Sequence, residues 1–217
     1  MRRRTFSRFV SRLAVLAAPL SVLPVVAQTQ AAFKEGAEYL KLAKPAPVDA
    51  PQGKVEVVEF FGYWCPHCAK FEPTFDAWAK KAPAHVVVRR NPIAFRPDQE
   101  PLQRLYFALE AMGKVDELHG KVFVALHGEK QRLATADQIV DWVAKQGVDR
   151  VKFLEFFNSF GVMGKVKRAS QLAEVYQIDG VPTMGVAGRY FTSGTQAGTV
   201  ERMLKVVEHL AESNRKG

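Results

Sequence analysis

The stretch Val55-Glu56-Val57-Val58-Glu59-Phe60-Phe61-Gly62-Tyr63-Trp64-Cys65-Pro66-His67-Cys68 decides the fold of this 217-residue chain. Its first seven residues are mostly β-branched or aromatic and predict a strand, and Gly62 to Trp64 predict a turn. The residues from Ala69 to Lys81 predict a helix. Pro66 suits the first helical position because its missing N–H needs no partner there and its φ is already helical. The order is therefore strand, turn and helix, with Cys65 at the helix start.

Cys65 and Cys68 are the only two cysteines of the chain. Their Cys-x-x-Cys spacing is typical of a redox pair or of half a zinc site. At a helix start, unpaired N–H groups and the positive end of the helix dipole favour the thiolate, which is the form that attacks disulfides. Structural zinc needs four ligands, and the other histidines show no pair at the usual short spacing. We therefore interpret the pair as redox-active, and we expect no metal and no organic cofactor.

His67 lies between the two cysteines. It can donate a hydrogen bond to a Cys65 thiolate or lie beside it as a cation, and either interaction stabilises the dithiol form. A more stable dithiol makes the disulfide a stronger oxidant. The alternative is that His67 is a solvent-facing helix residue without a role in the chemistry.

Two motifs resemble the DsbA family, the thioredoxin-fold oxidants of bacterial envelopes. Glu59 to Cys68 is similar to that family's active-site block, and Gly180-Val181-Pro182-Thr183 is similar to its second signature, a loop with a cis proline. The resemblance covers the chain from about Ala32 onward. It implies an α/β fold, a thioredoxin-like sheet with an inserted helical domain. It also implies that Pro182 is cis and packs beside the cysteine pair; an ordinary trans proline at a strand start is the alternative.

The remaining patterns agree with such a fold. His85–Arg90 predicts a second strand parallel to the first. Helical spacing of apolar residues predicts a helical insertion at approximately 98–176, with N-caps at Thr135 and Asp149. Two short strands and a terminal helix follow, at Thr183–Val186, Arg189–Thr192 and Thr199–Ala211. We interpret the apolar residues of one helix in the insertion as core: Phe153, Leu154, Phe156, Phe157 and Phe160.

The amino terminus predicts export. Five arginines precede an apolar stretch from Leu13 to Val26, and Val25-Val26-Ala27 offers a small-residue cleavage site. We therefore predict a signal peptide at residues 1–27, a DsbA-like domain at 28–217 and a location in the periplasm, with the export route left open. Removing five of 31 basic residues and none of 22 acidic ones lowers the net charge from +9 to +4. Nucleic-acid binding thereby loses its compositional support.

Glu59 is a further candidate because an acid in a central strand is buried and has a displaced pKa. By resemblance it lies beneath Cys68 and helps to move the Cys68 proton; the alternative is a structural acid paired with Arg89 or Arg90. We expect Glu56, nearer the strand start, to be exposed. Tyr63 and Trp64 are expected to form an apolar substrate-binding surface with Pro182, unless they are core residues.

Together these features predict a thiol:disulfide oxidoreductase that donates a Cys65–Cys68 disulfide to unfolded secreted proteins. The backbone of Val181 is expected to pair with the extended substrate. By resemblance, a quinone-linked membrane protein of the DsbB kind regenerates the disulfide. We expect a monomer, because no segment of the sequence resembles an assembly element. A disulfide isomerase, a thiol reductase and a non-catalytic holdase are the alternatives.

Overall fold

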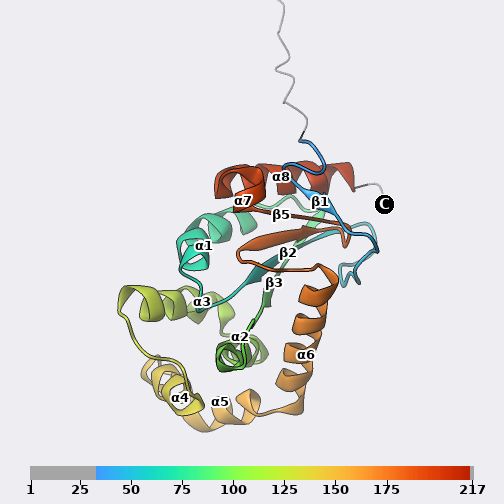
Figure 1. Cartoon of the computed structure of the whole chain (residues 1–217). Helices are drawn as coiled ribbons and strands as arrows, with labels where there is room; N and C mark the ends of the chain where they lie inside the picture. Colours follow the sequence, from blue (N-terminus) through green and yellow to red (C-terminus); the bar gives the residue numbers. More distant parts are fainter. Residues whose placement is uncertain (1–32, 216–217) are drawn as a thin grey trace, which may run out of the picture. The chain divides into compact units, whose positions relative to one another are not determined.

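The computed structural model describes residues 33–215, so the predicted signal peptide lies outside the described residues. Its five strands form one sheet in the order β1-β5-β4-β2-β3 (Figure 1). The strands are β1 (Leu40–Lys41), β2 (Val55–Phe61), β3 (Val86–Pro92), β4 (Thr183–Val186) and β5 (Tyr190–Ser193). The predicted parallel pairing is confirmed, since β2 and β3 run together with Val55 opposite Val86. Strand β4 closes the other side of β2 in the antiparallel sense.

All seven residues of β2 are buried, as its central place in the sheet requires. Val55 and Val57 pack toward α1 (Pro66–Ala79) and α8 (Val200–Ser213), whereas Val58 and Phe60 pack on the opposite face with Tyr176. This alternation follows from the two-residue period of a strand. Helices therefore cover both faces of the strand that leads directly to the cysteines.

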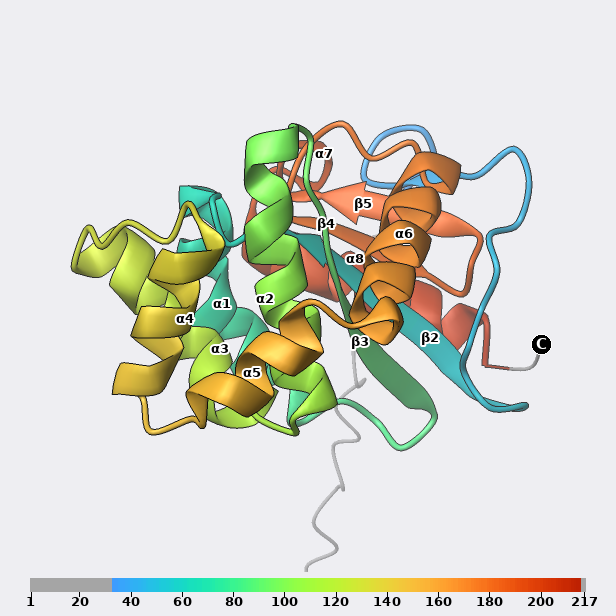
Figure 2. The same ribbon diagram turned by 90° about the horizontal axis from the view of Figure 1, so that it is seen from below.

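The helices between β3 and β4 have a core of their own. They are η1 (Pro97–Gln99), α2 (Glu100–Ala111), α3 (Val115–Phe123), the single π-turn η2 (Val124–Gly128), α4 (Ala136–Lys145), α5 (Arg150–Phe157) and α6 (Phe160–Val175). Figure 2 shows α2 to α5 gathered beside the sheet and α6 leading back to it. Asn91 of β3 anchors α6 by donating its side-chain amide to the Ala169 carbonyl at 3.1 Å.

The predicted N-caps are confirmed. Thr135 and Gln138 form a capping box at the start of α4, and Asp149 accepts the Lys152 N–H at the start of α5. Thr199 caps α8 in the same way, after the short helix α7 (Gly194–Ala197). No helix within residues 33–215 is long and apolar enough to span a membrane.

Two predictions about burial are wrong. Glu56 is buried, with 1% of its surface exposed, because Arg89 reaches across from the neighbouring strand and binds its carboxylate at 3.0 Å. Among the aromatic residues interpreted as core, only Phe153 and Phe157 are buried. Leu154 and Phe156 are 42% and 38% exposed, and Phe160 is 97% exposed because α5 ends before it and its side chain leaves the helical core.

Candidate active site

Cys65 is the N-cap of α1. Its backbone is extended and Pro66 takes the first helical position, as predicted. The Cys65 sulfur accepts the backbone N–H of Cys68 at 3.3 Å. One of the orphan donors of the helix start therefore points at this sulfur and stabilises negative charge on it.

The second motif lies against the first. The Val181–Pro182 peptide bond is cis, as the resemblance implied. The Cys65 thiol donates to the Val181 carbonyl oxygen at 3.4 Å. Val181 and Pro182 are half-buried, so part of this loop remains open to a substrate beside the sulfur.

Both cysteines are free thiols, and their environments displace their pKa values in opposite directions. A hydrogen bond from the Cys68 thiol is the main cause that lowers the pKa of Cys65, to about 6, and the backbone N–H groups of Cys68 and His67 and the charge of His67 add to it. Burial raises the pKa of Cys68. The anion of the reduced pair therefore resides on Cys65. The His67 side chain itself is exposed.

Glu59 combines features of both predicted roles. Burial raises the pKa of its carboxyl to about 8, and it pairs with Arg90, whose Nε lies 3.3 Å from its Oε2. A negative charge on Glu59 also raises the pKa of Cys68. Glu59 is thus a partnered buried acid that acts electrostatically on the second cysteine. Arg89, the other predicted partner, binds Glu56 instead.

Tyr63 does not form the predicted substrate surface. Only 1% of it is exposed, and its hydroxyl bonds with His119 Nδ1 at 2.7 Å, so the core alternative holds. Trp64 is half-buried: its indole N–H donates to the Ile93 carbonyl at 3.2 Å and its ring contacts Phe95. A Cβ at Gly62 would overlap this indole, which explains the glycine.

A groove of about 790 Å³ runs beside the cis-proline loop. His67, Val181 and Pro182 line it, together with Thr183 at the start of β4. The sequence did not predict the other residues that line this groove. They come from the segment between α6 and the cis-proline loop and from the segment that runs from β5 to the start of α8: Gln177, Ile178, Phe191, Ser193, Thr195, Gln196 and Thr199. These residues carry no motif. Gln177 and Ile178 directly precede the cis-proline loop, and the folding of β5 and α7 beside the loop brings the others to the site.

The buried polar residues behind the site were also missed. Glu72 of α1 and His119 of α3 lie 3.1 Å apart and are both buried. They are 47 positions apart in the chain, and neither belongs to a sequence motif. Among residues 33–215 no three side chains of the His, Cys, Asp and Glu types are arranged to hold a metal ion.

An acidic N-cap cysteine, a buried partner three residues on and a cis-proline loop over the first sulfur define a thioredoxin-fold thiol:disulfide oxidoreductase. Residues 56–205 match the DSBA-like thioredoxin domain, and the chain belongs to this family. It is 46% identical to the thiol:disulfide interchange protein DsbA of Bordetella parapertussis over the full length of both chains. The corresponding Pseudomonas aeruginosa protein is 43% identical over 84% of this chain and 86% of its own.

Solved structures also place the chain in the DsbA family. The crystal structure of Pseudomonas aeruginosa DsbA superposes with a TM-score of 0.81 at 42% identity, over 85% of this chain and 95% of that one. The oxidoreductase DsbA of Xylella fastidiosa superposes with a TM-score of 0.77 at 30% identity, over 84% and 97% of the two chains. The predicted α/β fold and family are thus confirmed.

Proposed function

We propose that this oxidoreductase works as a dithiol oxidase, which passes a Cys65–Cys68 disulfide to cysteine pairs of unfolded secreted proteins. The observation that carries the proposal is the opposite displacement of the two thiol pKa values, lowered to about 6 at Cys65 and raised at Cys68. A dithiol whose first sulfur, Cys65, is a stabilised anion is a weak reductant, so the corresponding disulfide is a strong oxidant.

The reaction proceeds in two exchanges. A client thiolate attacks the Cys65 sulfur, the Cys65–Cys68 bond breaks, and its electron pair goes to Cys68, which takes up a proton because its pKa is raised. A second client thiolate then attacks the client sulfur of the mixed disulfide. The electron pair of that bond returns to Cys65, which leaves as the favoured thiolate, and the client leaves with a disulfide.

Client chains bind in extended form. The backbone of Val181 and the groove beside Pro182 fit a segment that offers its own backbone groups next to the reacting cysteine. His67, at the groove's edge, contributes to the stability of the Cys65 thiolate. Trp64 adds a partly exposed aromatic surface near the site.

The proposed reaction requires an oxidising compartment and an electron acceptor. Signal-peptide-directed export to the periplasm supplies an oxidising compartment. Each turnover leaves a dithiol, so an acceptor of two electrons is required, and a quinone-linked membrane protein of the DsbB kind fits this need. The enzyme acts as a monomer and needs no bound organic cofactor beyond its own cysteine pair.

Reduced, unfolded ribonuclease tests the direction of the reaction. We expect the oxidised protein to restore ribonuclease disulfides in stoichiometric amounts, as each Cys65–Cys68 bond is consumed. An isomerase would instead rescue scrambled ribonuclease, and a holdase would do neither. Failure to oxidise reduced ribonuclease while reducing the scrambled form would identify a reductase and overturn the proposal.

A further inference from the structure

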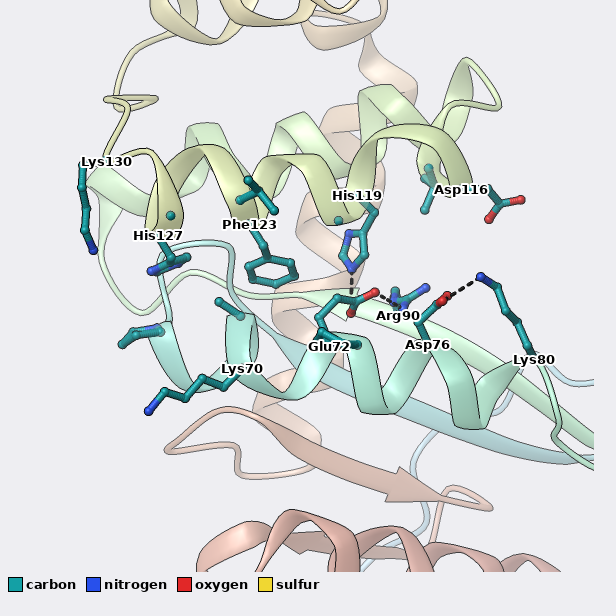
Figure 3. Close-up of a pocket in the computed structure, with 17 residues that line it drawn as sticks. Lys70, Glu72, Asp76, Lys80, Arg90, Asp116, His119, Phe123, His127 and Lys130 are labelled. Carbon is teal, nitrogen blue, oxygen red and sulfur yellow. Dashed lines mark hydrogen bonds and ion pairs between the residues drawn. The ribbon is translucent and has the colours of Figure 1, made fainter.

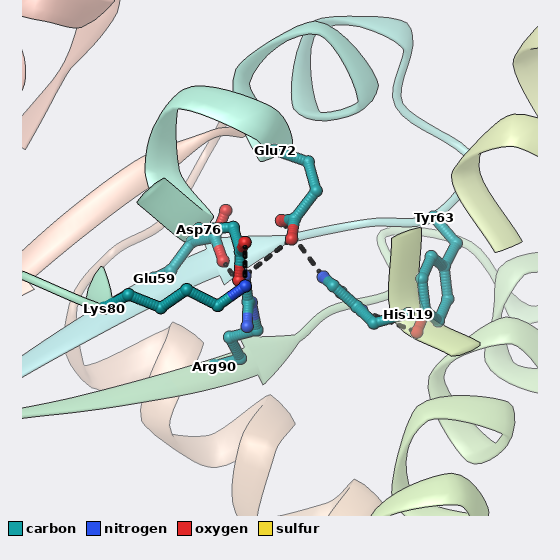
Figure 4. Close-up of polar contacts among 7 residues, drawn as sticks. All are labelled: Glu59, Tyr63, Glu72, Asp76, Lys80, Arg90 and His119. Carbon is teal, nitrogen blue, oxygen red and sulfur yellow. Dashed lines mark hydrogen bonds and ion pairs between the residues drawn. The ribbon is translucent and has the colours of Figure 1, made fainter. Parts of the chain in front are cut away.

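Two buried carboxylates share one cation behind the active site (Figure 4). Arg90 of β3 places Nη2 2.6 Å from Glu72 Oε1 and Nε 3.3 Å from Glu59 Oε2. Glu59 and Glu72 are 1% and 8% exposed, and the Arg90 side chain is 15% exposed. One guanidinium neutralises one carboxylate, and a second buried carboxylate is stable only with a proton. Because the bond from Arg90 to Glu72 is the shorter of the two, Arg90 neutralises Glu72 in preference to Glu59.

His119 strengthens this asymmetry. Its Nε2 lies 3.1 Å from Glu72 Oε2, and its Nδ1 lies 2.7 Å from the Tyr63 hydroxyl. Burial lowers the pKa of His119 and raises that of Tyr63, so the imidazole is neutral and the phenol keeps its proton. A carboxylate can only accept, so Nε2 carries the imidazole hydrogen and Nδ1 accepts from Tyr63. Tyr63, His119 and Glu72 thus form one directed hydrogen-bond chain that ends on the carboxylate.

The hydrogen-bond chain borders a groove between α1 and α3. This groove of about 730 Å³ is lined by Glu72, Arg90 and His119 at its base, and Figure 3 shows His119 pointing from α3 to Glu72 across it. The other titratable groups that act on this cluster are Cys68 and Asp76 of α1, and Tyr106 of α2. Asp76 is bound to Lys80 at 2.7 Å and is therefore neutralised separately. Glu59 lies on β2, with no base of its own other than the shared Arg90.

We propose that Tyr63, His119 and Glu72 are positioning residues which hold Arg90 on Glu72, so that Glu59 is the carboxylate that keeps the buried proton. Tyr63 donates to His119, His119 donates to Glu72, and the stabilised Glu72 anion binds Arg90. Glu59 is left as the neutral acid. Within residues 33–215, none of the three residues makes a hydrogen bond to the sulfur of Cys65 or Cys68.

This arrangement has a consequence for the second cysteine. A charge on Glu59 disfavours a thiolate on Cys68. A protonated Glu59 removes that repulsion at the moment when the Cys65–Cys68 bond breaks and negative charge appears on Cys68. Tyr63, although it is no part of the substrate surface, therefore acts on the chemistry through two other side chains.

The test follows the ionisation of Glu59 directly, by the ¹³C chemical shift of its carboxyl carbon against pH. The oxidised full-length protein is used, because neither cysteine ionises in it and no catalytic activity is needed; the outcome is therefore independent of whether the protein proves to be an oxidase. In the wild-type protein we expect a midpoint at about 8. In Glu72→Gln, where Arg90 is released to Glu59, the midpoint falls by more than about one pH unit.

Tyr63→Phe removes one donor and keeps the ring. We expect the Glu59 midpoint to fall in the same direction by a smaller amount, because a less stabilised Glu72 anion holds Arg90 less firmly and leaves it closer to Glu59. Glu117→Gln is the control: it removes an exposed acid of α3 that pairs with Lys114 at 2.6 Å, and it leaves the Glu59 midpoint unchanged.

The proposal fails if Glu59 titrates near 4.5 in the wild-type protein, or if its midpoint is the same in Glu72→Gln as in the wild type. A shift in Glu72→Gln without any shift in Tyr63→Phe removes Tyr63 and His119 from the positioning chain. Thermal unfolding of each variant identifies any that is not folded, and the remaining variant then decides.

Discussion

The Cys65 sulfur lies 3.4 Å from the carbonyl oxygen of Val181, a residue 116 positions further along the chain. This contact brings the two sequence motifs together at one point. It places the nucleophilic sulfur between a helix start, which favours its anion, and a loop whose backbone is open to a client chain. In the proposed function the substrate site and the redox site therefore coincide, and we expect changes to either motif to alter the same reaction.

The acidity of Cys65 is the first quantity to measure. We expect the thiolate absorbance of the reduced protein to rise with a midpoint at about pH 6. Cys68→Ala raises this midpoint most, because the Cys68 thiol makes the strongest stabilising contact, and His67→Ala raises it less. A wild-type midpoint near 9, or a larger effect of His67→Ala than of Cys68→Ala, would contradict this assignment of causes.

The two cysteines have separable roles. Cys65→Ser removes the sulfur that clients attack, so oxidation of reduced ribonuclease is abolished. Cys68→Ser keeps the Cys65 thiolate, which can still attack a client disulfide, and removes the thiol that could displace the client from Cys65, so mixed disulfides between Cys65 and clients accumulate. Non-reducing gels of periplasmic extracts detect them as bands that dithiothreitol removes. Equal residual activity in both variants would refute the roles.

Local patterns were enough to predict the elements that build the active site. The strand before Cys65, the helix after Pro66 and the caps at Thr135 and Asp149 depend on residues within a few positions of each other, and the structure confirms them. Pairings between distant segments were not predictable in this way. The burial of Tyr63 is such a case, because its partner, His119, lies 56 positions away on a helix whose packing position no local pattern specifies.

Burial was the least predictable property. A strand-start acid such as Glu56 is usually exposed, and its burial depends on Arg89 reaching it from β3. The sequence does not distinguish Phe157 from Phe160. Because α5 ends at Phe157 and α6 begins at Phe160, the chain changes direction between them, and Phe157 is buried in the core whereas Phe160 is exposed.

These two phenylalanines offer a matched test of that difference. Phe157→Ala removes a fully buried ring that also contacts the Arg104 guanidinium, and we expect a loss of about 3 to 5 kcal/mol in the free energy of unfolding. Phe160→Ala removes an exposed ring and changes the stability by less than about 0.5 kcal/mol. Urea unfolding followed by circular dichroism measures both. Similar losses in the two variants would show that Phe160 is packed in solution.

The stability of the reduced form depends on pH through Cys65. Its folded pKa, about 6, is depressed below its ordinary value of 9, so the stabilisation is complete above 9 and is lost as pH falls through 6. We therefore expect the reduced form to gain stability relative to the oxidised form between pH 6 and 9, and to melt at the higher temperature at pH 8. Thermal melts of both redox forms across this range measure the difference. A difference that does not change with pH would mean that Cys65 ionises alike in the folded and unfolded chains.

Glu59 has the opposite linkage. Its folded pKa, about 8, is raised above the ordinary 4.5, so the folded state is fully favoured below 4.5 and loses this advantage as pH rises through 8. Glu59→Gln keeps the size of the side chain and cannot ionise. We therefore expect its effect on the free energy of unfolding of the oxidised protein to be more stabilising at pH 7 than at pH 4, by about 3 kcal/mol. The oxidised form is chosen because its sulfurs do not titrate. Urea unfolding of the wild-type protein and of Glu59→Gln at both pH values gives the two differences. Asp76→Asn, which replaces a half-buried acid of α1 paired with Lys80, is the control. If the free energy of unfolding depends on pH in the same way in the wild-type protein and in Glu59→Gln, Glu59 is ionised in the folded protein. Arg90 then neutralises both carboxylates.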